Sequence, residues 1–379
     1  MLALFIFSLA FCAYTLFGYP LLLALLARGR GRRVRKAPRQ CTVSILLPVH
    51  NGERWLAAKL ESILQLRYPA ELLEILVVSD GSTDDTEAVA RSFSGRANLT
   101  FLALPRGGKA TALNAAMARA TGEILFFTDV RQDLEPMSVA NLVECFADPE
   151  IGVASGELII RDGNSLEEAS VGLYWKYEKW IRKQQSQLDS VLGATGCIYA
   201  MRRELAEPMP AGTLNDDMYL PLAAFFKGYR VILDDSALAF DYPTQLGSEF
   251  FRKVRTLAGV YQIVMRFPAL LGARNRMWLH FFSHKLARLF MPWAMLLAAL
   301  AGFGLPSPWR WWATGAQAAA YLLAVADAWI PGGFRVKRLT SPLRTFLVLM
   351  AASWFAAIMV FLPAGVLWKD THGAPGGGK

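Results

Sequence analysis

Short apolar runs alternate with amphipathic segments through the first third of the chain. The apolar runs predict buried strands at 42–48, 74–80, 99–105 and 122–129. Between them, helical periodicity predicts helices at about 53–66, 84–93 and 111–120; the first has Trp55, Leu56, Leu60, Ile63 and Leu64 on one face. Because continuously apolar strands are buried on both faces, this alternation predicts an α/β fold with a parallel sheet flanked by helices.

Four longer apolar segments predict helices that span a membrane. The first runs from Leu2 to Leu26 without a charged side chain, and about 20 apolar residues are enough to cross a bilayer. Its arginines and lysines follow the apolar core instead of preceding it, which favours an anchor over a cleaved secretory signal. The other three spans are expected at about 281–305, 309–330 and 343–368.

Basic residues beside these spans predict the topology. One cluster, at 28–36, follows the first span, and another includes Arg335, Lys337, Arg338 and Arg344. Since cytoplasmic flanks are enriched in Lys and Arg, both termini are expected outside and residues 28–280 in the cytoplasm. This arrangement predicts an integral membrane protein, in bacteria one of the inner (plasma) membrane.

The net charge of +9 raises nucleic acid as a partner. Much of the excess lies beside the predicted spans, so membrane lipids with anionic headgroups explain it and no nucleic-acid partner is expected. Residues 250–278 mix basic with apolar side chains, which predicts helices on the membrane surface. The cysteines lack the spacing of a zinc site or disulfide framework. His280 and His284 share a helix face, but a metal site where a helix enters the membrane is the less favoured interpretation.

Carboxylates follow two of the predicted strands. Asp80 ends the strand in "EILVVSD", and Asp129 ends the one in "GEILFFTD". In open α/β sheets ligands bind beyond the carboxyl ends of the strands, so both side chains are expected to face one crevice. Helix capping is the alternative for the acidic run after Asp80, and it accounts for Asp84 and Asp85 but not for Asp80 itself.

Two nucleotide-binding folds are excluded by their fingerprints. The first strand leads into "PVHNGE" and not into G-x-G-x-x-G, which argues against a dinucleotide-binding fold. The stretch "RGGKA" lacks the first glycine of a P-loop and has Ala110 where Ser or Thr follows the lysine.

Five segments in order resemble the signature of family 2 glycosyltransferases with the GT-A fold: "PVHNGE", "VVSDGSTDDT", "GGKATALNAAMARATGEILFFTD", "GATGCIYAMRREL" and "LNDDMYL". The resemblance covers about residues 42–262 and implies the α/β fold of that family, a mixed, mainly parallel sheet flanked by helices, with transmembrane and interfacial helices added. The membrane segments are similar to those of hyaluronan, chitin-oligosaccharide and poly-N-acetylglucosamine synthases. The resemblance implies an inverting enzyme that transfers a sugar from a nucleotide-diphosphate donor, a UDP-sugar being expected.

The same resemblance assigns roles to individual residues. Asp217 matches the catalytic base, and Asp129 matches the first carboxylate of D-x-D, which serves the donor's diphosphate and a metal ion. Asp80 is expected to bind a uracil-like base edge. Direct displacement needs such a base and positive charge for the leaving diphosphate. The expected substrate-binding residues are Pro48, Asn51, Glu53, Asp80, Lys109, Asp129, Arg131, Asp216, Arg252 and Arg255.

Two motifs depart from the family. Arg131 replaces the second Asp of D-x-D, which leaves Mg2+ or Mn2+ dependence open; Arg131 could pair with the diphosphate, or Asp133 could reach the metal. Arg255 keeps the diphosphate-clamping position of Q-x-x-R-W, where a planar guanidinium suits phosphate oxygens. Thr256 replaces the Trp on which an acceptor sugar rests, which puts long-chain processivity in doubt.

Structural alternatives remain for two further stretches. "NDD" at 215–217 is also typical of a solvated turn before a helix, although its place after "GATGCIYAMRREL" favours function. The carboxylate of Asp216 is expected to raise the proton affinity of Asp217. The aromatic residues of 174–180 could stack on sugars, but their helical spacing favours packing.

The sequence thus predicts five parts: an N-terminal transmembrane helix (1–27), a cytoplasmic GT-A domain (28–248), basic interfacial helices (249–280), three transmembrane helices (281–368) and a flexible tail (369–379). The expected reaction adds sugar to a glycan for polysaccharide synthesis and export. One alternative is a single addition to a lipid-linked acceptor. Another is a non-catalytic scaffold that binds nucleotide sugars, which Arg131 keeps open.

Overall fold

A computed structural model describes residues 1–96, 98–161, 166–242, 246–331 and 334–359. The chain divides into two compact units. We call Gly29–Arg161 with Arg182–Tyr242 the α/β unit, and Met1–Arg28, Asp162–Ile181 and Pro243–Lys379 the helical unit. Residues 166–181, expected inside the cytoplasmic domain, therefore belong to the helical unit. The expected tail at 369–379 lies outside the described residues.

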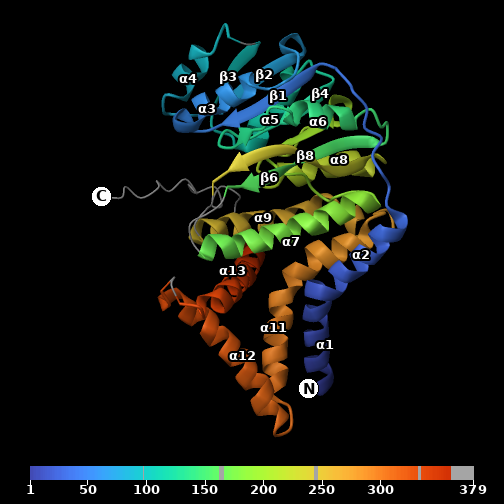
Figure 1. Cartoon of the computed structure of the whole chain (residues 1–379), viewed down its shortest axis with the longest axis vertical. Helices are drawn as coiled ribbons and strands as arrows, with labels where there is room; N and C mark the ends of the chain where they lie inside the picture. Colours follow the sequence, from blue (N-terminus) through green and yellow to red (C-terminus); the bar gives the residue numbers. More distant parts are fainter. Residues whose placement is uncertain (97, 162–165, 243–245, 332–333, 360–379) are drawn as a thin grey trace. The chain divides into compact units, whose positions relative to one another are not determined.

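The α/β unit is built on one mixed sheet (Figure 1). Within the described residues its order is β3-β2-β1-β4-β7-β6-β8-β5, eight strands. Strands β1, β2, β3 and β4 run parallel, while β7 is antiparallel to both β4 and β6. The strands are β1 (Val43–Val49), β2 (Leu73–Asp80), β3 (Leu99–Leu104), β4 (Ile124–Phe127), β5 (Asp133–Leu134), β6 (Ile151–Ile160), β7 (Tyr199–Arg202) and β8 (Arg230–Asp241).

Helices connect and cover these strands. They are α3 (Glu53–Leu64), η2 (Ala70–Leu72), α4 (Thr86–Ser92), α5 (Lys109–Arg119), α6 (Ser138–Cys145), η3 (Arg203–Leu205) and α8 (Asp216–Phe226). The core lies between sheet and helices; Val43, Ile45 and Leu47 of β1 are fully buried with Leu56 of α3. Each strand and helix predicted between residues 42 and 129 exists, with ends shifted by up to two residues. The predicted fold class is confirmed.

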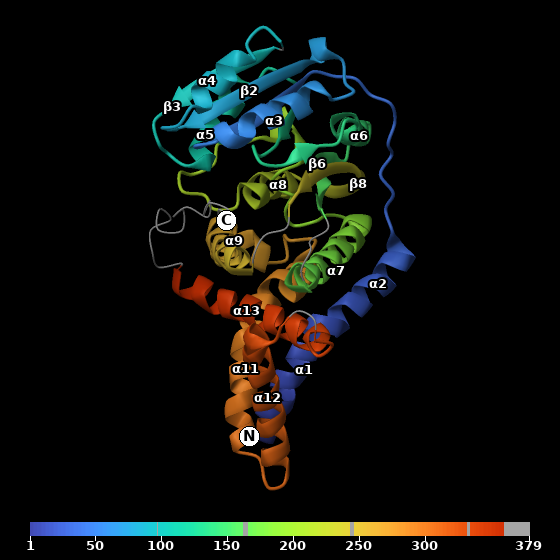
Figure 2. The ribbon, with the colours of Figure 1, turned by 60° about the vertical axis from the view of Figure 1, so that its left-hand side comes forward.

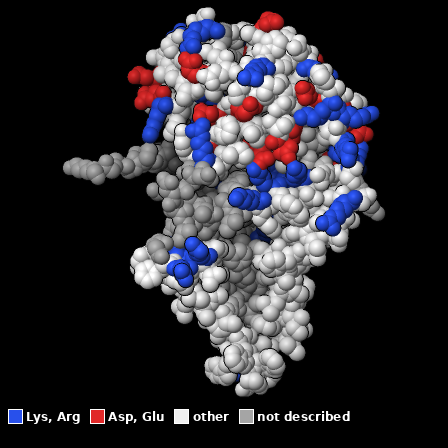
Figure 3. Space-filling model, viewed as in Figure 1, with Lys and Arg blue, Asp and Glu red and all other residues white. Residues whose placement is uncertain are grey.

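The helical unit consists of α1 (Leu2–Ala13), η1 (Tyr14–Gly18), α2 (Tyr19–Arg30), α7 (Leu166–Leu188, which ends in the α/β unit), α9 (Leu246–Arg266), η4 (Pro268–Leu271), α10 (Trp278–His280), η5 (Phe281–Leu286), α11 (Ala287–Phe303), α12 (Trp309–Ala326), η6 (Asp327–Trp329) and α13 (Lys337–Met359). Helix α1 packs along α11 (Figures 1 and 2). In Figure 3 the charged side chains gather over the α/β unit, whereas the surface of α11 and α12 is almost free of them.

Among the described residues, three helices are long and apolar enough to cross a membrane: Leu2–Gly29, Trp278–Phe303 and Lys337–Met359. Helix α12 covers most of the third expected span, 309–330, but is not among them, since Arg310 and Gln317 interrupt its apolar side chains. The last expected span reaches beyond residue 359, outside the described part. The orientation across the membrane and the surface placement of 249–280 stay predictions.

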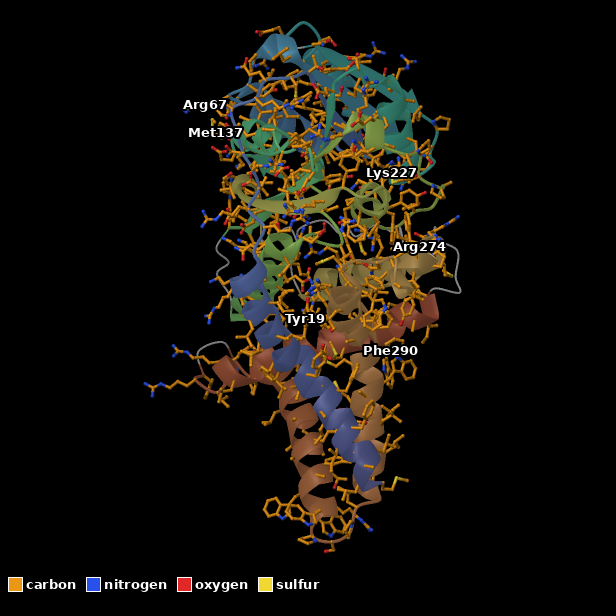
Figure 4. The ribbon with its side chains drawn as sticks, turned by 90° about the vertical axis from the view of Figure 1, so that its right-hand side faces the viewer. Tyr19, Arg67, Met137, Lys227, Arg274 and Phe290 are labelled. Carbon is orange, nitrogen blue, oxygen red and sulfur yellow. The ribbon has the colours of Figure 1, made fainter. Side chains whose placement is uncertain are left out.

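The two histidines considered for metal binding take protein partners in the helical unit. His280 Nδ1 lies 3.1 Å from the hydroxyl of Tyr19, which Figure 4 labels. His284 Nε2 lies 3.0 Å from a carboxylate oxygen of Glu178 on α7. Both contacts give the histidines a role in helix packing.

Candidate active site

The carboxyl ends of three parallel strands lie at one edge of the sheet. Val49 of β1 pairs with Ser79 of β2, and Leu46 of β1 pairs with Phe127 of β4. The segments that follow these strands therefore emerge side by side, as expected for the binding edge of an open α/β sheet.

Asp80, at the end of β2, holds the turn that begins α5. Its carboxylate accepts N–H bonds from Gly107 (2.6 Å) and Gly108 (2.9 and 3.0 Å), and it pairs with the Arg106 guanidinium at 2.5 Å. Gly81 makes this approach possible: its φ is +63°, and a Cβ there would lie 2.7 Å from the backbone nitrogen of Arg106. Asp80 thereby orients the residue after the turn, Lys109. Its predicted contact with a nucleobase stays a prediction.

Asn51 and Glu53 tie the segment after β1 to the segment after β2. The Asn51 side-chain oxygen accepts an N–H from Thr83 (2.8 Å), and a Glu53 carboxylate oxygen accepts one from Asp85 (2.9 Å). Asn51 has a φ of 47°, in the left-handed region that asparagine tolerates. Pro48, half-buried within β1, lies just before this brace. These predicted donor-binding residues thus shape the edge of the site.

Lys109 joins carboxylates from two distant parts of the chain. Its Nζ lies 2.9 Å from Asp129 Oδ1 and 3.1 Å from Asp216 Oδ2. Burial alone would lower the pKa of Lys109, but the charges of Asp129 and Asp216 raise it above its usual value. The ammonium is therefore permanently charged at the strand edge, where an anionic ligand would be held.

Asp216 and Asp217 form the first turn of α8, with Asn215 as N-cap. The backbone oxygen of Asp217 accepts an N–H from Ala194 at 2.6 Å. A Cβ placed on Gly196 would lie 3.3 Å from Asp217 Oδ2, so the 194–196 backbone packs against this side chain. The "NDD" segment is therefore a helix start within the site, and not a solvated turn.

The arginine that departs from D-x-D is held by the neighbouring strand. Arg131 forms an ion pair with Asp241 at the end of β8, and Gln132 Nε2 donates to the same carboxylate at 2.8 Å. Asp133, the alternative metal ligand, lies 3.4 Å from the guanidinium of Arg161. The expected roles of Arg131 and Asp133 toward a diphosphate or a metal stay predictions.

Arg252 and Arg255 lie on α9 of the helical unit. The Arg252 guanidinium is 5.2 Å from the ring centroid of Trp175, and the ammonium of Lys253 is 5.0 Å from the same ring. Trp175, from the predicted aromatic stretch, therefore packs against cations; the side chain of Tyr174 is outside the described part. Contacts of both arginines with a donor stay predictions.

Comparisons with known proteins bear on what this arrangement does. The model of the family described as "Glycosyl transferase family 2" matches residues 44–209. The chain carries a family 2 glycosyltransferase domain. The match confirms the predicted family and enzyme class for this domain. Asp216 and Asp217 lie just beyond the matched residues.

The names of curated relatives agree with the assignment of this domain. The "Probable glycosyltransferase YdaM" of Bacillus subtilis (strain 168) is 24% identical over 60% of this chain and 57% of its own. The "Poly-beta-1,6-N-acetyl-D-glucosamine synthase" of Staphylococcus epidermidis is 23% identical over 59% of this chain and 56% of its own. The chain thus spans little more than half the length of these curated relatives.

One solved structure is similar over nearly the whole chain. The mannosyltransferase PcManGT from Pyrobaculum calidifontis, solved in complex with GDP-Man and Mn2+, matches 95% of this chain and 99% of its own. The sequence identity is 26% and the TM-score 0.73. The similarity therefore includes helices outside the α/β unit.

The Mn2+ in that relative raises the question whether this site fits a divalent ion. Among the described residues, no group of three or more His, Cys, Asp or Glu side chains could hold a metal. Ions such as Mg2+ are commonly bound by one or two carboxylates together with substrate phosphates. The Asp129 side chain is 37% exposed at the strand edge. The residues present fit an ion held by Asp129 and the donor's diphosphate, and not a site made by protein alone.

Two residues near these carboxylates were not predicted from the sequence. Tyr199 of β7 stacks on Phe127, and burial, with Asp216 as a further cause, raises the pKa of its phenol well above the usual value. Lys59 of α3 is 1% exposed. The sequence could have indicated Lys59, because it lies on the apolar face of its helix, one turn from Leu56 and Ile63, where a charged residue is unusual.

Proposed function

We propose that this glycosyltransferase moves a sugar, with inversion, from a nucleotide-diphosphate donor to an acceptor at the membrane. The observation that carries the proposal is the convergence of Lys109, Asp129 and Asp216 beside Asp217 in the α/β unit, most of which matches the family 2 model. These groups supply a fixed positive charge and a carboxylate base, the two requirements of a displacement at an anomeric carbon.

The residues divide the chemistry between them. The Asp217 carboxylate takes the proton of the acceptor hydroxyl as its oxygen forms a bond to the anomeric carbon and the bond to the donor diphosphate breaks. Lys109 offsets the negative charge that develops on the leaving diphosphate. Asp216 holds Lys109 in place by their ion pair. A divalent ion at Asp129 would supply further charge neutralisation.

The donor proposal combines sequence and similarity. The sequence resemblance favours a UDP-sugar, whereas the relative that matches nearly the whole chain was solved with GDP-Man. We therefore place GDP-mannose first among the donors to be tested, with UDP-sugars after it. Both present the diphosphate for which Lys109 and Asp129 are arranged.

The acceptor is proposed to be a glycan or a lipid-linked sugar. Three described helices long and apolar enough to cross a membrane support an acceptor held there. Thr256 favours a single addition to a lipid-linked acceptor over a long polymer: its hydroxyl bonds to the Arg252 carbonyl oxygen of its own helix (2.9 Å), and no aromatic ring stands at this position. Product length on a defined acceptor separates the two.

The test is turnover and donor binding by the full-length protein in lipid nanodiscs. With GDP-mannose, then UDP-sugars, release of nucleoside diphosphate and of glycosylated product is measured. Asp217→Asn should lower turnover by ~10²-fold or more and leave donor affinity within a few-fold, because it removes only the base. Asp235→Asn, at an exposed ion pair with Lys183, is the matched control.

Wild-type protein that releases no diphosphate from any donor would refute the proposal. Turnover unchanged by Asp217→Asn would refute the assignment of the base, and donor binding without turnover in the wild type would favour the scaffold.

A further inference from the structure

Lys59 is a buried cation that the proposed reaction does not use. It lies on α3 between Leu56, Leu60 and Ile63 and is 1% exposed. Its Nζ donates to Thr128 Oγ1 (2.7 Å) and to the Gln132 carbonyl oxygen (2.6 Å). Burying an ammonium forfeits its hydration, so an apolar side chain would serve packing alone at lower cost.

The two acceptors of Lys59 bracket the turn that carries Asp129. Thr128 and Gln132 flank 129–131, so the ammonium holds both ends of this segment at one point. Gln132 in turn donates from its side chain to Asp241 at 2.8 Å. Lys59 therefore restrains where Asp129 stands at the strand edge.

Thr128 also connects Lys59 to the segment beside Asp217. The Thr128 hydroxyl that accepts from Lys59 donates to the Cys197 carbonyl oxygen at 2.9 Å. The preceding residue, Gly196, packs against the Asp217 side chain. A continuous path of short contacts thus links Lys59 to the segments carrying the donor-binding carboxylate and the base.

We propose that Lys59 is a positioning residue for glycosyl transfer, which sets the placement of Asp129 relative to Asp217 through Thr128 and Gln132. This inference rests on the proposed function and deepens it. A displacement of 1 Å between reacting groups can cost ~10²-fold in rate, so loss of this restraint lowers turnover more than it lowers donor binding.

The experiment compares Lys59→Met, Thr128→Val and the double variant in the full-length protein. Methionine keeps much of the length of the lysine side chain without its charge, and valine keeps the shape of threonine without its hydroxyl. We expect kcat to fall by ~10²-fold in Lys59→Met, with the KM for the donor changed by only a few-fold. Because Lys59 acts in part through Thr128, the loss in the double variant is smaller than the product of the single losses.

The matched control is Lys227→Met, which removes a lysine labelled in Figure 4 that pairs with Glu207 at 2.7 Å. It should leave kcat unchanged. Active sites are counted by donor binding, so that a variant which merely folds less well shows fewer sites with normal kcat. That outcome, or a multiplicative loss in the double variant, overturns the inference.

Amide hydrogen exchange tests the same claim without catalysis. In Lys59→Met, exchange should rise in 128–132 and in 194–197, and stay unchanged in β3. If the wild-type protein transfers no sugar, the proposed function fails and this measurement still decides the role of Lys59. Unchanged exchange in both segments overturns it.

Discussion

Replacing Lys109 by methionine tests the central electrostatic feature of the site. The ammonium lies 2.9 Å from Asp129 and 3.1 Å from Asp216, and methionine keeps much of its length without the charge. Two carboxylates then face each other with no cation between them. The change should therefore destabilise the α/β unit and also remove the proposed contact of Lys109 with the donor.

The structure sets the size of this effect. Since both carboxylate oxygens lie within 3.1 Å of one nitrogen, they are at most about 6 Å apart. At an effective dielectric constant of about 20, like charges at about 6 Å repel by ~3 kcal/mol. Asp129 is 37% exposed, so solvent screening reduces the expected loss to ~2 kcal/mol. For a unit of this size, that loss lowers Tm by about 4–8 °C.

Thermal unfolding of the full-length variants in nanodiscs measures the change, with Lys227→Met as control for removal of an exposed ion-paired lysine. Asp216→Asn added to Lys109→Met should restore most of the lost Tm, because one of the two facing charges is gone. Donor affinity should stay low in the double variant, since the cation is still missing. A double variant less stable than Lys109→Met would refute the electrostatic reasoning.

Three further outcomes are expected. Gly81→Ala should lower the free energy of unfolding by ~1–3 kcal/mol and weaken donor binding, since its Cβ would meet Arg106 at 2.7 Å. Gly95→Ala is the control: it is also at positive φ but has nothing within 4 Å, so it should lower the free energy of unfolding less and leave donor binding unchanged. Burial lowers the pKa of Lys59 from 10.5 to about 8, so the unfolded chain binds more protons between these values. Stability should therefore rise with pH across this window by up to ~3 kcal/mol relative to Lys59→Met, and a flat difference in Tm would contradict it. Chelation of divalent ions should lower turnover and Mn2+ restore it, with Asp129→Asn needing more Mn2+; equal Mn2+ titrations would exclude Asp129 as ligand.

Local patterns predicted the strands and helices of the α/β unit as far as residue 129, which is four of the eight strands in its described residues. The burial of β1 and β2 on both faces and the apolar stripe of α3 are properties of neighbouring residues, so the sequence predicted these elements within two residues. It also predicted that Asp80 and Asp129 each follow a parallel strand and lie at the same edge of the sheet; the two strands, β2 and β4, flank β1. The apolar run at 309–330 was less informative. It predicted a helix correctly, but α12 contains polar side chains and is not apolar enough to be a candidate membrane span.

The pairing of the functional groups required the tertiary structure. Lys109 and Asp216 are 107 positions apart, and only the packing of α8 in the α/β unit decides that they meet at 3.1 Å. Similarly, the position of Lys59 on an apolar stripe was visible, but its acceptors at Thr128 and Gln132 come from another part of the chain. Whether a segment forms a helix or a strand depends on interactions within a few residues, and the local sequence pattern reflects these interactions. The placement of charges depends on which surfaces pack together, and this is decided by contacts across the whole unit.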